Sequence, residues 1–257
     1  MGIRVDLNCD MGESFGNYKI GMDEDIVQYI SSANIACGFH ASDPLVMEKT
    51  IGLCRQAGVA PGAHPGFPDL VGFGRRQMKV TMPELKAMII YQVGALKAFA
   101  EAEGLSLQHV KPHGAMYNMA GKDPQMADAI CEGIASVDPD LILLGLSGSA
   151  FEGAAARAGL RFAREVFADR AYEEDGSLVA RGKDGAMITD EQEAIRRVIS
   201  MVKDHKVKAI TGKEIAVSPD SICLHGDSPK AVLFAKMIRE ELTREGIEIA
   251  PIVQVIG

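Results

Sequence analysis

Hydrophobic residues along this chain fall into short runs that alternate with longer amphipathic stretches. Seven short runs have the aliphatic and β-branched content of strands, at residues 3–9, 34–37, 59–63, 107–111, 141–146, 162–168 and 221–224. Seven longer stretches are typical of helices, at residues 23–31, 44–57, 82–103, 124–136, 150–158, 190–204 and 229–245. Strands that alternate with helices in this way indicate βαβ units and a parallel sheet.

Capping residues mark the ends of several expected helices. Thr81 and Glu84 have the spacing of a capping box. A capping residue precedes a proline at positions 44, 124 and 229, and proline suits the first helical turn. Glycines at positions 58, 104, 159 and 246 stand where helices should end. These signals agree with the hydrophobic pattern.

The whole chain is expected to form one α/β domain, residues 1–257. No linker and no change of composition divides it, and α/β barrels of about 250 residues are common single domains. Residues 169–189 are the exception to the regular pattern, because they are rich in charge and glycine. Loops this long inside a compact domain are commonly functional, so we expect a lid or a wall of the site.

Polar residues gather at the ends of the expected strands. They are Asp6, Asn8, Asp10 and Glu13; His40; His64; Lys111 and His113; Ser147 and Ser149; Glu165, Asp169 and Arg170; and His225 and Asp227. In a parallel barrel these ends meet at one face, where enzymes of this architecture place their chemistry. Because strand side chains alternate, the acidic stripe 6, 8 and 10 should face the lumen and its rim. The sequence therefore predicts a polar pocket.

Taken singly, each of these residues has a structural explanation. One His or Asp after a strand is commonly a loop or capping residue. The prediction of a functional site therefore depends on so many such residues lying at the ends of the expected strands. His109 lies within its strand and His205 in a lysine-rich helix end, and neither is assigned to the site. A divalent metal on Asp10, His40 and His64 is chemically reasonable for zinc or manganese, although the spacing fixes no ligand set.

Two motif matches fail. The acidic residues of 6–17 resemble the start of an EF-hand, but Met11 and Asn17 stand where that loop needs Gly and Glu. Residues 145–149 lack the spacing of a nucleophile elbow. Neither a calcium loop nor a serine nucleophile is expected.

Composition excludes several classes of partner. The net charge is -8 without a basic run, which argues against a nucleic-acid backbone. No apolar stretch approaches the roughly 18 residues of a membrane span and no signal peptide opens the chain, so we expect no membrane partner and a cytoplasmic location. The five cysteines are scattered without a C-x-x-C pair, which predicts reduced core residues.

Seven strings of residues together resemble the LamB/YcsF family: DLNCDMGE, NIACGFHASDP, GAHPGFPDLVGFGRR, VKPHGAMYN, EVFADRAY, LVAR and CLHGD. They cover the chain nearly end to end, and Ser42, where members commonly have Gly, is a small departure. The resemblance implies a TIM-like, seven-stranded (β/α) barrel related to glycoside hydrolase and deacetylase barrels. It also implies ATP-dependent opening of 5-oxoproline to L-glutamate, with 5-oxoprolinase subunits B and C as partners.

Lactam hydrolysis requires carbonyl activation, an attacking water and a proton for the departing nitrogen. ATP as co-substrate would phosphorylate the amide oxygen, and the barrel mouth would bind that intermediate or the lactam. For catalysis we expect Asp10 or Glu13 to activate water and a histidine among His40, His64, His113 and His225 to protonate nitrogen. For substrate binding we expect Lys111, Arg170 and Arg181 to hold a carboxylate or phosphate, with Asp6, Asn8, Glu165, Asp169 and Asp227.

Residues 72–76, GFGRR, are glycine-rich and basic but lack the Walker pattern. Arg75 and Arg76 either bind a phosphate of the nucleotide or belong to a solvated turn. ATP binding elsewhere stays open.

Two other functions compete with the oxoprolinase reading. One is a stand-alone, metal-dependent deacetylase of an N-acetylated sugar, which would need a tightly bound divalent ion at the carboxylate and histidine cluster. The other is a regulatory subunit that binds a lactam or sugar without converting it. Aromatic residues make up only 5% of the chain, and sugar sites commonly use aromatic faces, which favours the lactam.

Overall fold

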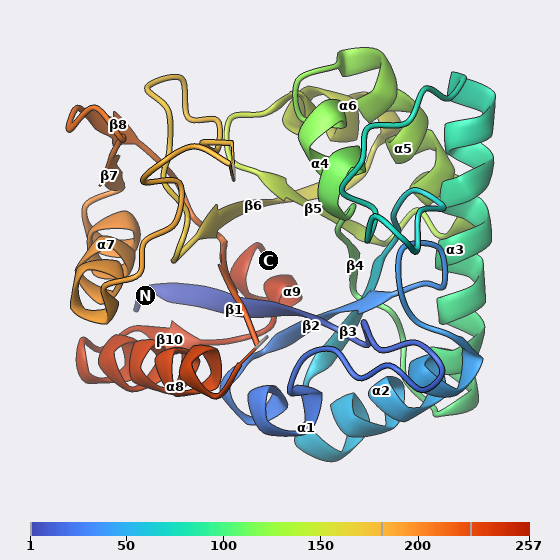
Figure 1. Cartoon of the computed structure of the whole chain (residues 1–257), viewed down its shortest axis with the longest axis horizontal. Coiled ribbons are helices and arrows are strands. Elements are labelled where there is room, and N and C mark those ends of the chain that lie inside the picture. Colours follow the sequence, from blue (N-terminus) through green and yellow to red (C-terminus); the bar gives the residue numbers. More distant parts are fainter. Residues whose placement is uncertain (1, 181, 227) are drawn as a thin grey trace.

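Seven parallel strands form a closed barrel in the computed structural model, which describes residues 2–180, 182–226 and 228–257. The strands run in the order β1-β2-β3-β4-β5-β6-β9, and β9 pairs with both β6 and β1, which closes the ring (Figure 1). Their bounds are β1 Arg4–Met11, β2 Ser32–Ala36, β3 Ala60–His64, β4 His109–Val110, β5 Ile142–Leu146, β6 Arg161–Phe167 and β9 Ser221–Leu224. The predicted seven-stranded, TIM-like barrel is confirmed.

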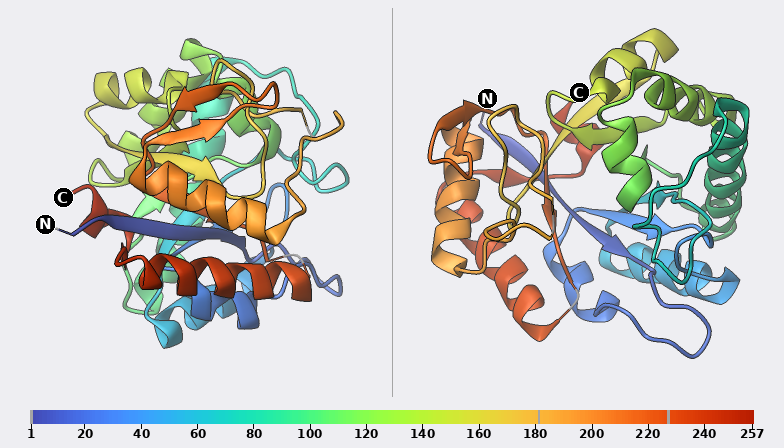
Figure 2. Two further views of the ribbon diagram at one scale, coloured as in Figure 1. Left: turned by 90° about the vertical axis from the view of Figure 1, so that its left-hand side faces the viewer. Right: turned by 45° about the horizontal axis from the view of Figure 1, so that its top comes forward.

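Helices cover the outside of the barrel (Figure 2). They are α1 Asp23–Ile26, α2 Pro44–Ala57, α3 Met82–Ala102, α5 Pro124–Val137, α6 Ala150–Ala158, α7 Glu191–Lys203 and α8 Pro229–Arg244, whereas the short helix α4 Gly114–Ala120 follows β4 at the carboxyl end of the barrel. The capping box at Thr81 is present, and Asp43, Asp123 and Ser228 cap the helices that begin with proline. None of these helices, nor any other in the described parts of the chain, is long and apolar enough to cross a membrane.

Several short elements differ from the predicted pattern. The expected helix 23–31 is only α1 followed by a 3₁₀ turn, Val27–Tyr29, because the chain enters β2 at residue 32. Helix α4 was not predicted. Nor were the hairpin β7 Lys206–Lys208 and β8 Glu214–Ala216, the strand β10 Glu248–Ile249 and the helix α9 Ile252–Val255. All are short, so they carry little hydrophobic periodicity of their own.

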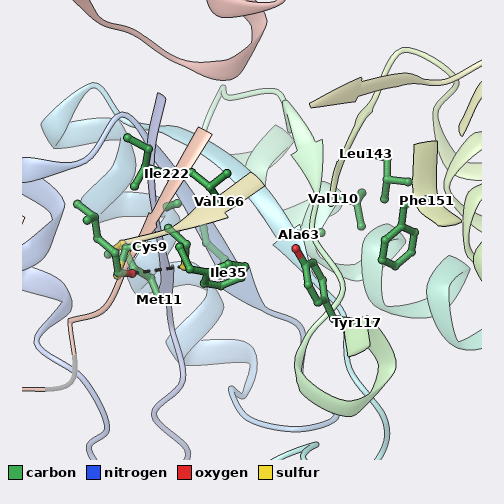
Figure 3. Close-up of a cluster of buried hydrophobic side chains, with 14 of the residues drawn as sticks. Cys9, Met11, Ile35, Ala63, Val110, Tyr117, Leu143, Phe151, Val166 and Ile222 are labelled. Atoms are coloured by element: carbon green, nitrogen blue, oxygen red, sulfur yellow. Dashed lines mark hydrogen bonds between the residues drawn. The ribbon is translucent and has the colours of Figure 1, made fainter. Parts of the chain in front are cut away.

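The hydrophobic core lies between the barrel and its helices (Figure 3). On β1, the alternate residues Val5, Leu7, Cys9 and Met11 are fully buried on the outward side. They continue into the outward residues of the neighbouring strands, among them Ile35, Ala63, Val110, Leu143, Val166 and Ile222. All five cysteines are buried and free of disulfides, as the pattern predicted.

The amino-terminal end of the barrel is closed by α9, which lies near the middle of the ring of strands in Figure 1. Ile252 packs against Ile142, Leu144 and Ala163. The backbone N–H of Val253 donates a hydrogen bond of 3.0 Å to the side-chain oxygen of Gln108. These contacts place α9 across the amino-terminal end of the barrel.

Residues 169–189 pack against the barrel through their own small cluster of apolar side chains. Ala171, Val179 and Ala186 are buried together, and Ile188 and Ile210 pack on them. The guanidinium of Arg170 donates from Nη2 to the backbone oxygen of Val179 at 2.7 Å. This bond ties the middle of the segment to the end of β6.

Candidate active site

A cavity of about 890 Å³ opens at the carboxyl ends of the strands. Residues 175–180 form one of its walls, together with the loops after β4 and β5. Eight of the predicted site residues line it: Asp10, Glu13, His64, Arg75, Lys111, His113, Arg170 and His225. They lie on β1 and β3, just after the ends of β1, β4, β6 and β9, and in the loop before α3, so the fold brings together side chains that are far apart in sequence.

Lys111 is buried at the floor of the cavity between two carboxylates. Its Nζ lies 3.0 Å from Asp10 Oδ1 and 2.7 Å from Glu165 Oε1. Tyr117 donates a 2.6 Å hydrogen bond to the other oxygen of Glu165. Burial alone would lower the pKa of Lys111, but the charges of Asp10 and Glu165 hold it well above its usual value. Lys111 therefore stays a cation.

Asp10 links this lysine to the histidines. It accepts a 2.8 Å hydrogen bond from Asn34, and its Oδ2 lies 3.3 Å from His64 Nε2. Burial opposes ionisation, yet the neighbouring His64 and Lys111 hold the pKa of Asp10 well below its usual range. Asp10 is therefore a carboxylate at neutral pH, with one oxygen near Lys111 and the other near His64.

Three histidines and Glu13 form a compact cluster beside Asp10. Their nearest ligand atoms all lie within 4.8 Å of one another. The His40 and His113 rings stack with centroids 3.7 Å apart, and His64 meets both rings edge-on. Three imidazoles and a carboxylate have the composition of a metal-binding site.

Two glycines make room for this cluster. A Cβ atom on Gly66 would lie 2.6 Å from His40 Nδ1. One on Gly74 would lie 2.7 Å from the Cβ of His40 and 2.9 Å from the His113 ring, and Gly74 also has a φ of +62°. Any other residue at these positions would push the imidazoles apart.

His225 and Asp169 form a second group suited to proton transfer. His225 Nδ1 lies 2.7 Å from Asp169 Oδ2. An ionised carboxylate only accepts hydrogen bonds, so Nδ1 carries the proton and the carboxylate fixes the tautomer and orientation of the ring. Asp169 itself does not line the cavity and acts on it through His225.

Five other predicted site residues lie outside the lining of the cavity. Asp6 and Asn8 were expected to bind substrate, but they lie deeper in the lumen and bond to its walls, and Glu165 lies beneath Lys111. His40 is buried behind the other histidines, outside the lining of the cavity. Arg76 pairs with Asp69 through both carboxylate oxygens, which holds it away from the cavity.

The remaining predicted residues, Arg181 and Asp227, lie outside the described part of the chain. Sequence reasoning missed Tyr117, which lines the cavity and bonds Glu165. Its place in the string KPHGAMYN, six residues after Lys111, was the available signal.

Asp6→Asn is expected to gain stability relative to wild type as the pH rises from 4 to 7. Burial raises the pKa of Asp6 from 3.8 to about 6, although hydrogen bonds from Ser221, Ser32 and Ser31 lower it in part. The folded wild type therefore binds this proton more tightly than the unfolded chain does. Wild type has the stability that this proton contributes below pH 4 and loses it as the pH rises through 6, whereas Asp6→Asn has no such proton to lose. Urea unfolding at the two pH values should show a relative gain of about 2–3 kcal/mol.

The exposed carboxylate Asp184 provides the matched control for this measurement. Asp184→Asn should follow wild type at both pH values. If the difference in free energy of unfolding between Asp6→Asn and wild type is the same at both pH values, the pKa of Asp6 is not raised in the folded protein.

The comparisons with known proteins agree with these motifs. The model of the LamB/YcsF family matches residues 5–257. A Clostridium beijerinckii protein, named as the A subunit of 5-oxoprolinase, is 65% identical over 249 residues, 97% of this chain and 98% of the relative. A Pyrococcus horikoshii protein of the same name is 56% identical over 254 residues, 99% of this chain and 100% of the relative. The crystal structure of a lactam utilization protein from Thermus thermophilus has a TM-score of 0.92 and 47% identity, covering 96% of this chain and 99% of that chain. The chain belongs to the LamB/YcsF family.

Proposed function

We propose that this chain is the A subunit of a 5-oxoprolinase and that its cavity opens the lactam ring of 5-oxoproline to give L-glutamate. The observation that carries the proposal is the 65% identity, over nearly the full length of both chains, to a protein named as the A subunit of that enzyme. The chemistry of the cavity is consistent with it, because carboxylates, histidines and cations surround one space.

The cations of the cavity suit a substrate that carries a carboxylate. Lys111 is a permanent positive charge at the floor, and Arg75 and Arg170 lie on the walls. Arg170 already gives one nitrogen to Val179, which fixes its guanidinium in place. Cations with fixed geometry bind carboxylate or phosphate groups with defined orientation.

Ring opening then requires two proton transfers. Water attacks the lactam carbonyl carbon and gives a proton to Asp10, the carboxylate that lines the cavity beside Lys111. The C–N bond breaks, and the ring nitrogen takes a proton from His225, whose imidazolium form Asp169 stabilises. His225 is favoured over His64 and His113, because the ring nitrogens of those two residues face each other.

Coupling to ATP supplies the activation that a stable amide needs. Transfer of a phosphoryl group to the amide oxygen gives an imidate phosphate, and the attacking water adds to its carbon. The C–N bond then breaks with protonation of the nitrogen and leaves an acyl phosphate, which a second water hydrolyses to the carboxylate of glutamate and free phosphate. The cavity volume lies near the upper end of the usual 300–1,000 Å³ range for ligand sites, so the cavity has room for such an intermediate. The sequence has no Walker pattern, so we assign ATP binding to partner subunits B and C, with Arg75 as a contact to the transferred phosphoryl group.

A sugar deacetylase is the weaker alternative. The names of the similar proteins concern 5-oxoproline or lactams, and they come from chains of 47% to 65% identity. These names give no support to an N-acetylated sugar as the substrate.

Reconstitution tests the proposal. The purified chain, mixed with subunits B and C, ATP and 5-oxoproline, should yield glutamate and ADP, and glutamate should fail to appear when this chain is omitted. The chain alone is also incubated with N-acetylated sugars. Undiminished glutamate production without the chain, or release of acetate by the chain alone, would refute the assignment.

A further inference from the structure

The protonation of the two histidines nearest Asp10 follows from their outer hydrogen bonds. His64 Nδ1 lies 2.6 Å from the backbone oxygen of Lys111, and His113 Nε2 lies 2.8 Å from that of Phe73. A carbonyl oxygen only accepts hydrogen bonds, so each of these outer nitrogens carries a proton. In the neutral rings, the inner nitrogens are therefore both acceptors.

These two acceptors point at each other. His64 Nε2 and His113 Nδ1 are 2.9 Å apart. Two lone pairs at this distance repel each other unless a cation lies between or beside them. A proton on one of these two nitrogens or a metal ion bound by both would remove the repulsion.

His40 adds a third imidazole without a hydrogen bond. The residue is only 1% exposed, and neither of its ring nitrogens has a hydrogen-bond partner within the described residues. Its Nε2 lies 3.5 Å from Glu13 Oε1, and the same oxygen lies 3.6 Å from His113 Nδ1. A buried polar group without a partner is costly, and an absent ligand is one of the standard explanations.

Three of the six separations between the donor atoms are close to those of a coordination sphere, and all six are within 4.8 Å. Four ligands at about 2.1 Å in a tetrahedron lie roughly 3.4 Å from one another. The separations between neighbouring donor atoms are 2.9, 3.5 and 3.6 Å. The backbone oxygens of Lys111 and Phe73 would be the outer partners that orient metal-bound imidazoles.

We propose that Glu13, His40, His64 and His113 bind one divalent cation of the zinc class. The nitrogen-rich donor set favours Zn²⁺ or Co²⁺ over Mg²⁺ and Ca²⁺, which prefer oxygen ligands. Glu13, His64 and His113 line the cavity, so the ion is accessible from it. A bound ion of this class polarises carbonyl groups and acidifies water. The site does not depend on the proposed function, because it rests on the donor atoms alone.

Metal analysis of the purified chain tests this site. After removal of metal with a chelator and titration with Zn²⁺, mass spectrometry should find one equivalent per chain, and Zn²⁺ should raise the melting temperature. Co²⁺ should give the visible absorption of a four-coordinate ion. Glu13→Gln and His40→Asn should each weaken Zn²⁺ binding at least tenfold.

His205→Asn is the matched control, because His205 lies outside the cluster and has a φ of +54° that Asn tolerates. It should bind Zn²⁺ like wild type. Wild-type protein that binds no stoichiometric Zn²⁺ would overturn the proposal. If His40→Asn fails to fold, Glu13→Gln and the Co²⁺ spectrum of wild type still decide, and unchanged Zn²⁺ affinity in folded Glu13→Gln would remove Glu13 from the site.

Discussion

Lys111→Met is expected to abolish ring opening by the reconstituted complex and to lower the free energy of unfolding by about 3–5 kcal/mol. The lysine is 3% exposed and lies between Asp10 and Glu165, at 3.0 and 2.7 Å. Methionine has a similar volume but no charge, so both carboxylates would lose their buried cation. Activity should fall if Lys111 binds the substrate carboxylate as we propose, because the floor of the cavity then loses this cation.

A double variant separates the two effects of this change. Lys111→Met combined with Glu165→Gln removes one of the uncompensated charges, and it should recover part of the lost stability without recovering activity. Urea unfolding measures the first quantity, and glutamate production by the complex measures the second. Full activity of the single variant would exclude Lys111 from the mechanism, and unchanged stability would show that the carboxylates do not depend on it.

The part of the site that could be predicted from sequence is the part that strand geometry dictates. Alternation along β1 places Asp10 on the inner face, and parallel strands carry His64 and Lys111 to the same end of the barrel. These side chains meet although they are separated by dozens of residues. The motifs that resemble the family include the residues at these same strand ends. The fold expected from the strand pattern and the fold expected from the family were therefore the same.

The alternation of side chains along a strand predicts which face a residue is on, but not how deep it lies along the barrel axis. Asp6 and Asp10 share a face, but Asp6 lies lower and bonds Ser31 and Ser32 at 2.7 and 2.6 Å, whereas Asp10 reaches the cavity. Which of the two is accessible depends on the stagger of neighbouring strands and on α9 at the far end. Neither is encoded in a local pattern.

Loop conformation limited the remaining assignments. Arg75 and Arg76 are adjacent in sequence, yet Arg76 turns to Asp69 while Arg75 lines the cavity with its guanidinium 5.0 Å from the Phe73 ring. Tyr117 was missed because it lies on the short helix α4, and its partner Glu165 is 48 residues away. Such pairs arise only from the tertiary fold.

Asp10→Asn is expected to reduce glutamate formation about 10²–10⁴-fold, the usual contribution of a general base, while the fold is retained. The amide has the shape of the carboxylate, and its oxygen can still accept hydrogen bonds from Asn34 and Lys111. It cannot take a proton from water. Lys111 keeps Glu165 at 2.7 Å as a counter-ion, so the loss of stability should be smaller than for Lys111→Met.

The turnover number of the complex, the circular dichroism spectrum and the Zn²⁺ content of the variant distinguish the ways in which Asp10 can act. A folded variant with normal Zn²⁺ binding and low turnover supports Asp10 as the base, because the loss is then confined to the proton transfer. Loss of Zn²⁺ together with turnover would instead make Asp10 a positioning residue, acting through His64 Nε2 at 3.3 Å. The exposed Asp184→Asn should match wild type in all three measurements. A complex with fully active Asp10→Asn would remove this carboxylate from the mechanism.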